Sequence, residues 1–280
     1  MHSLEALNLP SQQVAVLDDE YFGTALEQAP LLIRLEHHYP KHWEFLLLTQ
    51  QLALEVALHE QQPAGCVQAW LFVDRAVSLS RLATHLKRCM DVLVTSYELE
   101  LSQRQIQDRA LWRYFDPRQM IWLYQLLSAE QREYVFALTQ SWVSLNRQGQ
   151  AHIIHTEVSQ PPDLTQRLSF DARATAALER ISVIHQVIKR LRQQGHVVAE
   201  TQDAVIDAWL IKAAQEGLLR QEDQVQYCLA AWHWQPEHGH FESNPALRQA
   251  LQAVKSQGAS FQAAFQHSLI HSSYSTPNSL

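Results

Sequence analysis

The chain has 280 residues, 46% of them hydrophobic, which is enough for one large domain or two smaller domains with their own cores. Its formal net charge is −7, so it lacks the excess positive charge that binding to nucleic acid requires. Its three cysteines, Cys66, Cys89 and Cys228, are far apart and form no Cys-x-x-Cys pair, which argues against a disulfide framework and a zinc ribbon.

The first half of the chain alternates short apolar runs with segments of helical periodicity. Apolar runs that end in charge predict β-strands, and apolar residues that recur every three or four positions predict helices. The predicted strands are Val14–Asp19, Leu31–Glu36, Val67–Val73, Val92–Leu101 and Ala110–Phe115, and the predicted helices are His42–Gln61 and about Ser80–Cys89, the second introduced by Asp74 and Ser78. Because strands alternate with helices, we expect a layered α/β module with a mixed, partly parallel sheet.

Two further helix starts and a hairpin follow. Asp116 ends the last of these strands and caps a helix over Pro117–Leu127, because Pro suits the first helical position. Ser128 caps the next helix. Two extended runs within Trp142–Val158 predict a hairpin that turns around Asn146–Gln150.

A polar segment then separates this module from a region of helical character. Ser159–Gln166 holds two prolines and mostly uncharged polar residues, as linkers do. We expect an α/β domain over residues 1–158, a linker over 159–168 and an all-helical domain over 169–280, which makes the fold class α+β.

Five helices are expected after the linker. Their apolar residues recur at helical spacing, and Gly, Pro or Asn-Pro marks most of their ends. They are a first helix with Leu178, Ile181, Ile184, Val187 and Leu191 on one face, closed by Gly195; a second around Trp209, ended near Gly217; a third around Trp232, stopped by Pro236; a fourth started by Asn244-Pro245; and a fifth with Phe261, Phe265 and Leu269.

No motif for a catalytic or cofactor site is present. The chain has no Gly-rich phosphate loop, no Gly-x-Ser-x-Gly elbow and no His-Glu-x-x-His helix, so we expect no cofactor. Zinc would accept Cys228, His233, His238 and His240 as ligands, but their spacing matches no closed structural site and we expect no metal there.

Two pairs of side chains define the enzymatic alternative. His37 and His38 follow the second predicted strand, where an α/β sheet presents functional groups. Glu98 and Glu100 share one face if their segment is extended. Neither pair has a neighbouring residue that would complete a catalytic group, so we expect a solvated loop and a solvated strand face instead.

The segment Leu111–Met120, "LWRYFDPRQM", has the highest density of aromatic and charged residues. Strand alternation places Trp112 and Tyr114 on one face and Arg113 on the other, and Asp116 lies at the helix start with Arg118 in the first turn. The simplest interpretation is a strand-to-helix corner held by an Arg–Asp pair. An arginine among aromatic residues is also typical of protein–protein interfaces.

At this segment the chain resembles the adaptor, or effector chaperone, proteins of bacterial type VI secretion. Arg113–Arg118 matches their Arg-aromatic-aromatic-Asp-Pro-Arg signature, Ala29–Glu36 ("APLLIRLE") matches an upstream strand, and Trp70–Val92 resembles the strand and helix between them. The three matches occur in the family's order, within about Val14–Val143. The helical region resembles the C-terminal region of many members.

The resemblance implies a non-enzymatic adaptor that acts in the bacterial cytoplasm. Such proteins bind the N-terminal part of a toxic effector and promote its loading on the VgrG spike, so the expected partners are a cognate effector and VgrG, with no nucleic acid and no membrane. The residues that we expect to bind the partner, or to support the binding surface, are Trp112, Arg113, Tyr114, Asp116 and Arg118, together with Arg34. The alternatives are an enzyme of unknown reaction on an α/β scaffold and a purely structural helical interaction module.

Overall fold

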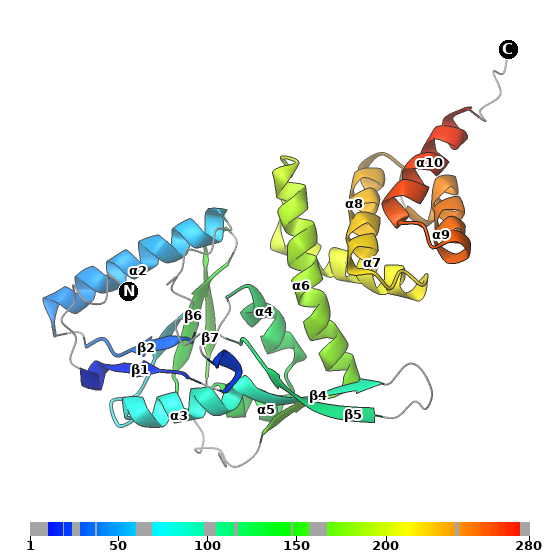
Figure 1. The fold of residues 1–280 in the computed structure, drawn as a ribbon. Coiled ribbons are helices and arrows are strands. Elements are labelled where there is room, and N and C mark those ends of the chain that lie inside the picture. Colours follow the sequence, from blue (N-terminus) through cyan, green and yellow to red (C-terminus); the bar gives the residue numbers. More distant parts are fainter. Residues whose placement is uncertain are drawn as a thin grey trace. The chain divides into compact units, whose positions relative to one another are not determined.

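The chain divides into two compact units, residues 1–178 and 179–280. In the computed structural model, shown in Figure 1, the residues described are 11–18, 20–23, 29–36, 38–59, 69–97, 105–114, 117–146, 148–156, 167–238 and 241–274. None of the helices in these ranges is both long enough and apolar enough to cross a membrane.

The first unit combines short strands with helices (Figure 1). Most of the strands and helices predicted from the sequence are present within it, many of them shorter than expected, but β8 was not predicted, because Leu168 was assigned to the linker and Ser169 and Phe170 to the all-helical region. In chain order the elements of the unit are β1 (Val14–Val16), β2 (Leu31–Ile33), α2 (Pro40–His59), β3 (Trp70–Phe72), α3 (Leu79–Met90), β4 (Asp91–Tyr97), β5 (Gln105–Leu111), α4 (Pro117–Leu126), α5 (Ala129–Val135), β6 (Ser141–Leu145), β7 (Ala151–His155) and β8 (Leu168–Phe170), with short 3-10 turns at Ser11–Gln13 and Glu20–Phe22.

Three small sheets organise these strands. β1 and β2 form an antiparallel pair, and β3, β6 and β7 form an antiparallel sheet in the order β3-β6-β7. In the third sheet β4 lies between β5, to which it is antiparallel, and β8, to which it is parallel. The expected mixed, partly parallel sheet is therefore confirmed, with β8 as its parallel strand.

Local side-chain bonds explain why several elements begin and turn where they do. The Ser78 side chain accepts a hydrogen bond from Arg81 N, and Ser128 forms a reciprocal capping box with Gln131. In the β6–β7 hairpin, Asn146 Oδ1 accepts from the backbone N–H groups of Gln148 at 3.0 Å and Gln150 at 2.8 Å. The predicted caps Ser78 and Ser128 and the predicted hairpin turn are confirmed, whereas the predicted cap Asp116 lies outside the described residues.

The core of the first unit lies against α3. Leu82, Leu86, Cys89 and Met90 of this helix are buried. Phe170 of β8 belongs to the same core, and the residues at the start of α6 (Ala172–Gln193) pack against it. α6 thus begins in the first unit and continues into the second.

Two of the predicted boundaries that differ from the structure belong to a strand of the first unit and a helix of the second. The strand expected over Ala110–Phe115 instead covers Gln105–Leu111, and it ends at Leu111 because the residue opposite Trp112 is Met90, which belongs to α3. The third C-terminal helix was expected to stop at Pro236 but runs to His238. The helix continues for only two residues beyond the proline, so it still ends within one turn of Pro236.

The second unit is helical, as expected. Gly195 and Gly217 have positive φ values of 86° and 87° and follow the ends of the first two helices, as the sequence indicates. The Asn244 side chain accepts from Ala246 N and caps the helix that begins at Pro245. After α6 the elements are α7 (Asp203–Gln215), α8 (Gln221–His238), α9 (Pro245–Gln257) and α10 (Phe261–Tyr274), with short 3-10 turns at Glu200–Gln202 and Phe241–Ser243.

The limits of the expected domains stay a prediction. Most of the expected linker, residues 159–166, lies outside the described residues. Its last residue, Leu168, begins β8 and pairs with Val92 of β4.

Candidate partner-binding surface

The aromatic residues of the corner segment, which we define as Leu111–Met120, lie inside the first unit. Trp112 and Tyr114 are 4% and 3% exposed. Trp112 N donates to Met90 O at 2.8 Å, and the Tyr114 hydroxyl donates to Leu86 O at 3.0 Å. Both residues therefore bind the last turn of α3, and the alternation expected from the sequence holds although this stretch is not a strand.

Their rings belong to an aromatic cluster in the core. The ring centroid of Trp112 lies 5.1 Å from that of Phe170, and the centroid of Tyr114 lies 5.7 Å from that of Trp142. Phe136 meets Trp142 edge-on at 5.1 Å. Burial raises the pKa of Tyr114, so its hydroxyl stays a donor near neutral pH. The two corner aromatics thus support the fold of this unit and are covered by it.

The other predicted residues of the corner differ in how they are placed. The Arg113 side chain is exposed, so it is available to a partner. Asp116 and the side chain of Arg118 lie outside the described part of the chain, and the expected Arg–Asp pair stays a prediction. Arg34, on the earlier motif, is half-buried, and its Nε lies 3.5 Å from Glu36 Oε1.

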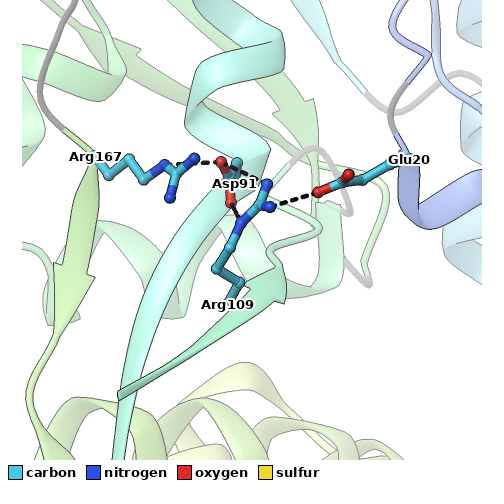
Figure 2. Close-up of polar contacts among 4 residues, drawn as sticks. All are labelled: Glu20, Asp91, Arg109 and Arg167. Atoms are coloured by element: carbon cyan, nitrogen blue, oxygen red, sulfur yellow. Dashed lines mark hydrogen bonds and ion pairs between the residues drawn. The ribbon is translucent and has the colours of Figure 1, made fainter.

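A cluster of charged residues fastens the neighbouring elements to the start of β4, as Figure 2 shows. Asp91 accepts two hydrogen bonds from Arg109, both at 3.0 Å, and its Oδ2 lies 2.9 Å from Arg167 Nε. Arg109 also reaches Glu20, with 2.6 Å between Nη1 and Oε1. Hydrogen bonding to Asp91 raises the pKa of Arg109, which stays charged. Sequence reasoning missed this cluster because its members are far apart in the chain and belong to no motif.

The outer face of α2 carries an exposed apolar stripe. Trp43, Leu47 and Leu54 are 51%, 63% and 40% exposed. They occupy positions i, i+4 and i+11, which fall on one face of a helix and span about 16 Å along its axis. We call these three residues the α2 stripe. The sequence predicts the helix and the apolar character of these positions, but it does not indicate which face is left uncovered.

A second face of α2, about 120° around the helix axis from the stripe, is fixed to the rest of the first unit. His42 Nδ1 accepts from Glu36 N at 2.9 Å, and Thr49 Oγ1 accepts from Trp70 Nε1 at 3.1 Å. Ala53 on the same face is also buried. α2 is thus packed against the unit through this face and keeps the apolar face of the stripe exposed to solvent.

The sheet face next to α2 is also partly apolar and exposed. Phe72 is 55% exposed and lies two residues from Trp70, whose indole contacts α2, so Phe72 points to the same face of β3. Ile153 of β7 is 49% exposed and shares that face, because Val143 pairs with both Trp70 and Ile153. Isolated exposed apolar residues are common, but a helical stripe and a sheet face on one side of a unit are typical of an interaction surface.

The candidate catalytic and metal-binding residues are placed as follows. His38 Nε2 lies 3.2 Å from Glu36 Oε2, whereas His37, Glu98 and Glu100 lie outside the described residues. Cys228 is buried, which raises the pKa of its thiol, and His233 is exposed. The side chains of His238 and His240 are outside the described part, and within that part no three His, Cys, Asp or Glu residues form a group that would hold a metal ion.

Residues 1–134 match the model of a family described as a domain of unknown function, DUF4123. The matched span contains α2 and the corner segment and ends within α5. No curated protein and no solved structure matches the chain.

Proposed function

We propose that this protein is a non-enzymatic adaptor that binds the N-terminal part of a type VI secretion effector and promotes its loading on the VgrG spike. The observation that carries the proposal is the α2 stripe, an apolar helix face that the described part of the first unit leaves open to solvent. The ordered motifs that resemble adaptor proteins support it, and so does the match to the DUF4123 model over the same residues.

The stripe has the properties that reversible binding requires. Its three side chains keep roughly half of their surface in water. Covering that surface would contribute about 1 kcal/mol for each residue, at about 25 cal/mol per Å² of apolar area. This is enough to anchor an apolar segment of a toxin as a small hot spot and still permit release to the next component of the assembly.

The corner segment has a supporting role in this proposal. Trp112 and Tyr114 hold the last turn of α3 and the sheets in place, and α2 is fixed to the same unit through Trp70. Arg113 is the exposed member of the segment and would contact the partner directly. The signature shared with adaptor proteins would therefore preserve the unit that presents the surface.

Co-purification tests the proposal. The full chain is co-expressed with the toxin encoded by the neighbouring gene, either intact or without its N-terminal part, and with the VgrG protein of the same cluster. We expect the adaptor to retain the intact toxin, to lose the truncated toxin, and to increase the amount of toxin recovered with VgrG. Failure to retain a soluble, intact toxin would contradict the proposal, as would equal recovery of the truncated form.

A further inference from the structure

The helical unit contains an open groove between α8 and α10, bordered by the end of α6. Its volume is about 340 Å³, near the lower limit of the range of about 300–1,000 Å³ for ligand pockets. Its apolar lining includes Leu229 and Phe261, which are buried, and Phe265 and Ala230, which are half-buried. The lining residues of α8 extend from Gln226 to Trp234 and those of α10 from Phe261 to Leu269, so the groove is about 12 Å long.

The polar part of the lining consists mainly of side-chain amides. They belong to Gln194, Gln226, Gln262 and Gln266. Gln194 Oε1 lies 3.1 Å from His233 Nε2, and Gln226 Nε2 donates to Glu222 Oε1 at 2.8 Å. Among the described residues nothing pairs with the amides of Gln262 and Gln266, which lie one turn apart on α10.

The groove carries no formal charge at neutral pH. None of its lining residues is Asp, Glu, Lys or Arg. Burial, and then the nearby His196, lowers the pKa of His233, the one titratable group in the lining. A charged side chain would lose hydration on entering this groove and would find no opposite charge there, so an uncharged occupant complements it best.

The glutamine amides further restrict the kind of uncharged molecule that would fit the groove. A glutamine amide offers two donors and one acceptor, which complement the C=O and N–H groups of a peptide main chain. An extended chain rises about 3.3 Å per residue, so the groove accommodates three or four residues, with alternate side chains directed to the same side. Two apolar side chains at positions i and i+2 would then lie on the apolar lining while the amides bind the main chain.

We propose that the groove between α8 and α10 binds a short, uncharged, extended segment of a partner polypeptide, with two apolar side chains at positions i and i+2. This site belongs to the helical unit and adds a second binding site to the α2 stripe of the proposed adaptor.

A random library of phage-displayed 12-residue peptides, selected on the full-length chain, supplies the probes. Selected peptides are synthesised and their binding is measured by fluorescence anisotropy. We expect the selected peptides to be uncharged and to share an apolar-x-apolar core. Their Kd should rise at least tenfold for the Ala230→Trp variant, in which an indole occupies the groove. Ala214→Trp, at an exposed position of α7, is the matched control and should leave the Kd unchanged.

A second variant keeps the test decisive if Ala230→Trp fails to fold. Gln266→Glu changes an exposed residue, removes the two amide donors and adds a charge to the groove, so it should also weaken binding. Selection of mainly charged peptides, or an unchanged Kd in Gln266→Glu, would overturn the inference. Loss of peptide binding in Leu47→Asp would also overturn the inference, because it would show that the peptides bind the α2 stripe. Toxin retention by the adaptor is measured separately and does not depend on this outcome.

Discussion

The Tyr114 hydroxyl donates a hydrogen bond to Leu86 O, with 3.0 Å between the two oxygen atoms. This bond joins the corner segment to the carbonyl group of Leu86, one turn before the end of α3 at Met90. The ring of Tyr114 also lies between those of Trp112 and Trp142, at centroid distances of 5.5 and 5.7 Å. A residue of the recognisable motif therefore fixes the corner segment to α3 and fills part of the core at the same time.

Tyr114→Phe should lower stability and keep the fold. The ring stays, but Leu86 O loses its buried donor, which costs about 1 kcal/mol and lowers the melting temperature of a unit of this size by roughly 2–4 °C. Calorimetry of the variant measures the shift. Tyr39→Phe, which removes a hydroxyl from a tyrosine that is 46% exposed, is the control; an equal shift in both variants would show that the Tyr114 bond adds no stability.

Arg113→Ala tests the exposed member of the corner segment. Its side chain is exposed, so its removal should leave the melting temperature nearly unchanged. We expect less toxin to be retained, because arginine is a frequent anchor at interfaces. The measurement is toxin recovery at equal amounts of folded adaptor. Arg173→Ala, at an exposed position of α6, is the matched control, and recovery that is the same for both variants would exclude Arg113 from the interface.

Much of the fold is predictable because local rules fix it. Ser78, Ser128 and Asn244 begin helices through their own side chains, and Asn146 turns the β6–β7 hairpin in the same way. These signals depend on neighbours within four residues, so one sequence is enough to find them. The pairing of β8 with β4 is different, because nothing near Leu168 indicates that its partner is Val92.

The α2 stripe could not be predicted from the sequence, because its exposure also depends on residues that are far apart in the chain. The apolar positions of α2 predict a helix, but Trp43 and Ala53 are equally apolar and only tertiary packing decides that the first is exposed and the second buried. For the same reason the motif around Trp112 suggested a contact surface, and the structure places that ring in the core. A pattern of residue types reports which positions are apolar, and long-range contacts determine what covers them.

Leu47→Asp should separate binding from folding. Leu47 is 63% exposed in the centre of the α2 stripe, so a carboxylate there costs the isolated protein little stability but would be buried without a partner charge in a complex. We expect toxin recovery to fall at least tenfold, with a melting temperature within about 2 °C of the unmodified protein, as is usual for surface substitutions.

The control for that variant is the adjacent leucine. Leu48 is 44% exposed but points about 100° away around the helix axis, off the stripe. Leu48→Asp makes the same chemical change, and toxin recovery should stay close to that of the unmodified protein. If the two variants lost the toxin to the same degree, the stripe would not be the element that the partner recognises.

Asp91→Asn should weaken the charge cluster shown in Figure 2. The amide cannot hold both Arg109 and Arg167 as the carboxylate does, so the free energy of unfolding should fall by the small amount that is usual for partly exposed ion pairs. Urea unfolding measures the loss, which should shrink as salt is raised to 1 M because salt screens exposed charges. Asp108→Asn, at an exposed position on β5, should change stability less at every salt concentration; a loss that did not depend on salt would point to packing instead of charge.

Acid should destabilise the first unit through His85. Its ring is fully buried, Nε2 lies 3.3 Å from Val135 O, and the surrounding titratable groups are Cys89, Tyr134, Arg81 and Arg88. Burial is the main cause that lowers the pKa of His85, and the two arginines act in the same direction. The neutral ring is thus favoured in the folded state, whereas in the unfolded chain the imidazole has its ordinary pKa of about 6.5.

The sign of the pH dependence follows from this difference. Below about pH 6.5 the unfolded chain binds a proton that the folded unit does not, so this contribution to stability is complete above that pH and is lost as the pH falls, by up to about 1.4 kcal/mol per pH unit. His85→Gln should therefore flatten the decline in unfolding free energy between pH 6.5 and 5, measured by urea unfolding. Cys89→Ala is the control, because it removes a buried neighbour that does not ionise in this range: burial raises the pKa of the Cys89 thiol. Cys89→Ala should lower the unfolding free energy but keep its slope against pH. An unchanged slope in His85→Gln would show that another group is responsible for the acid sensitivity.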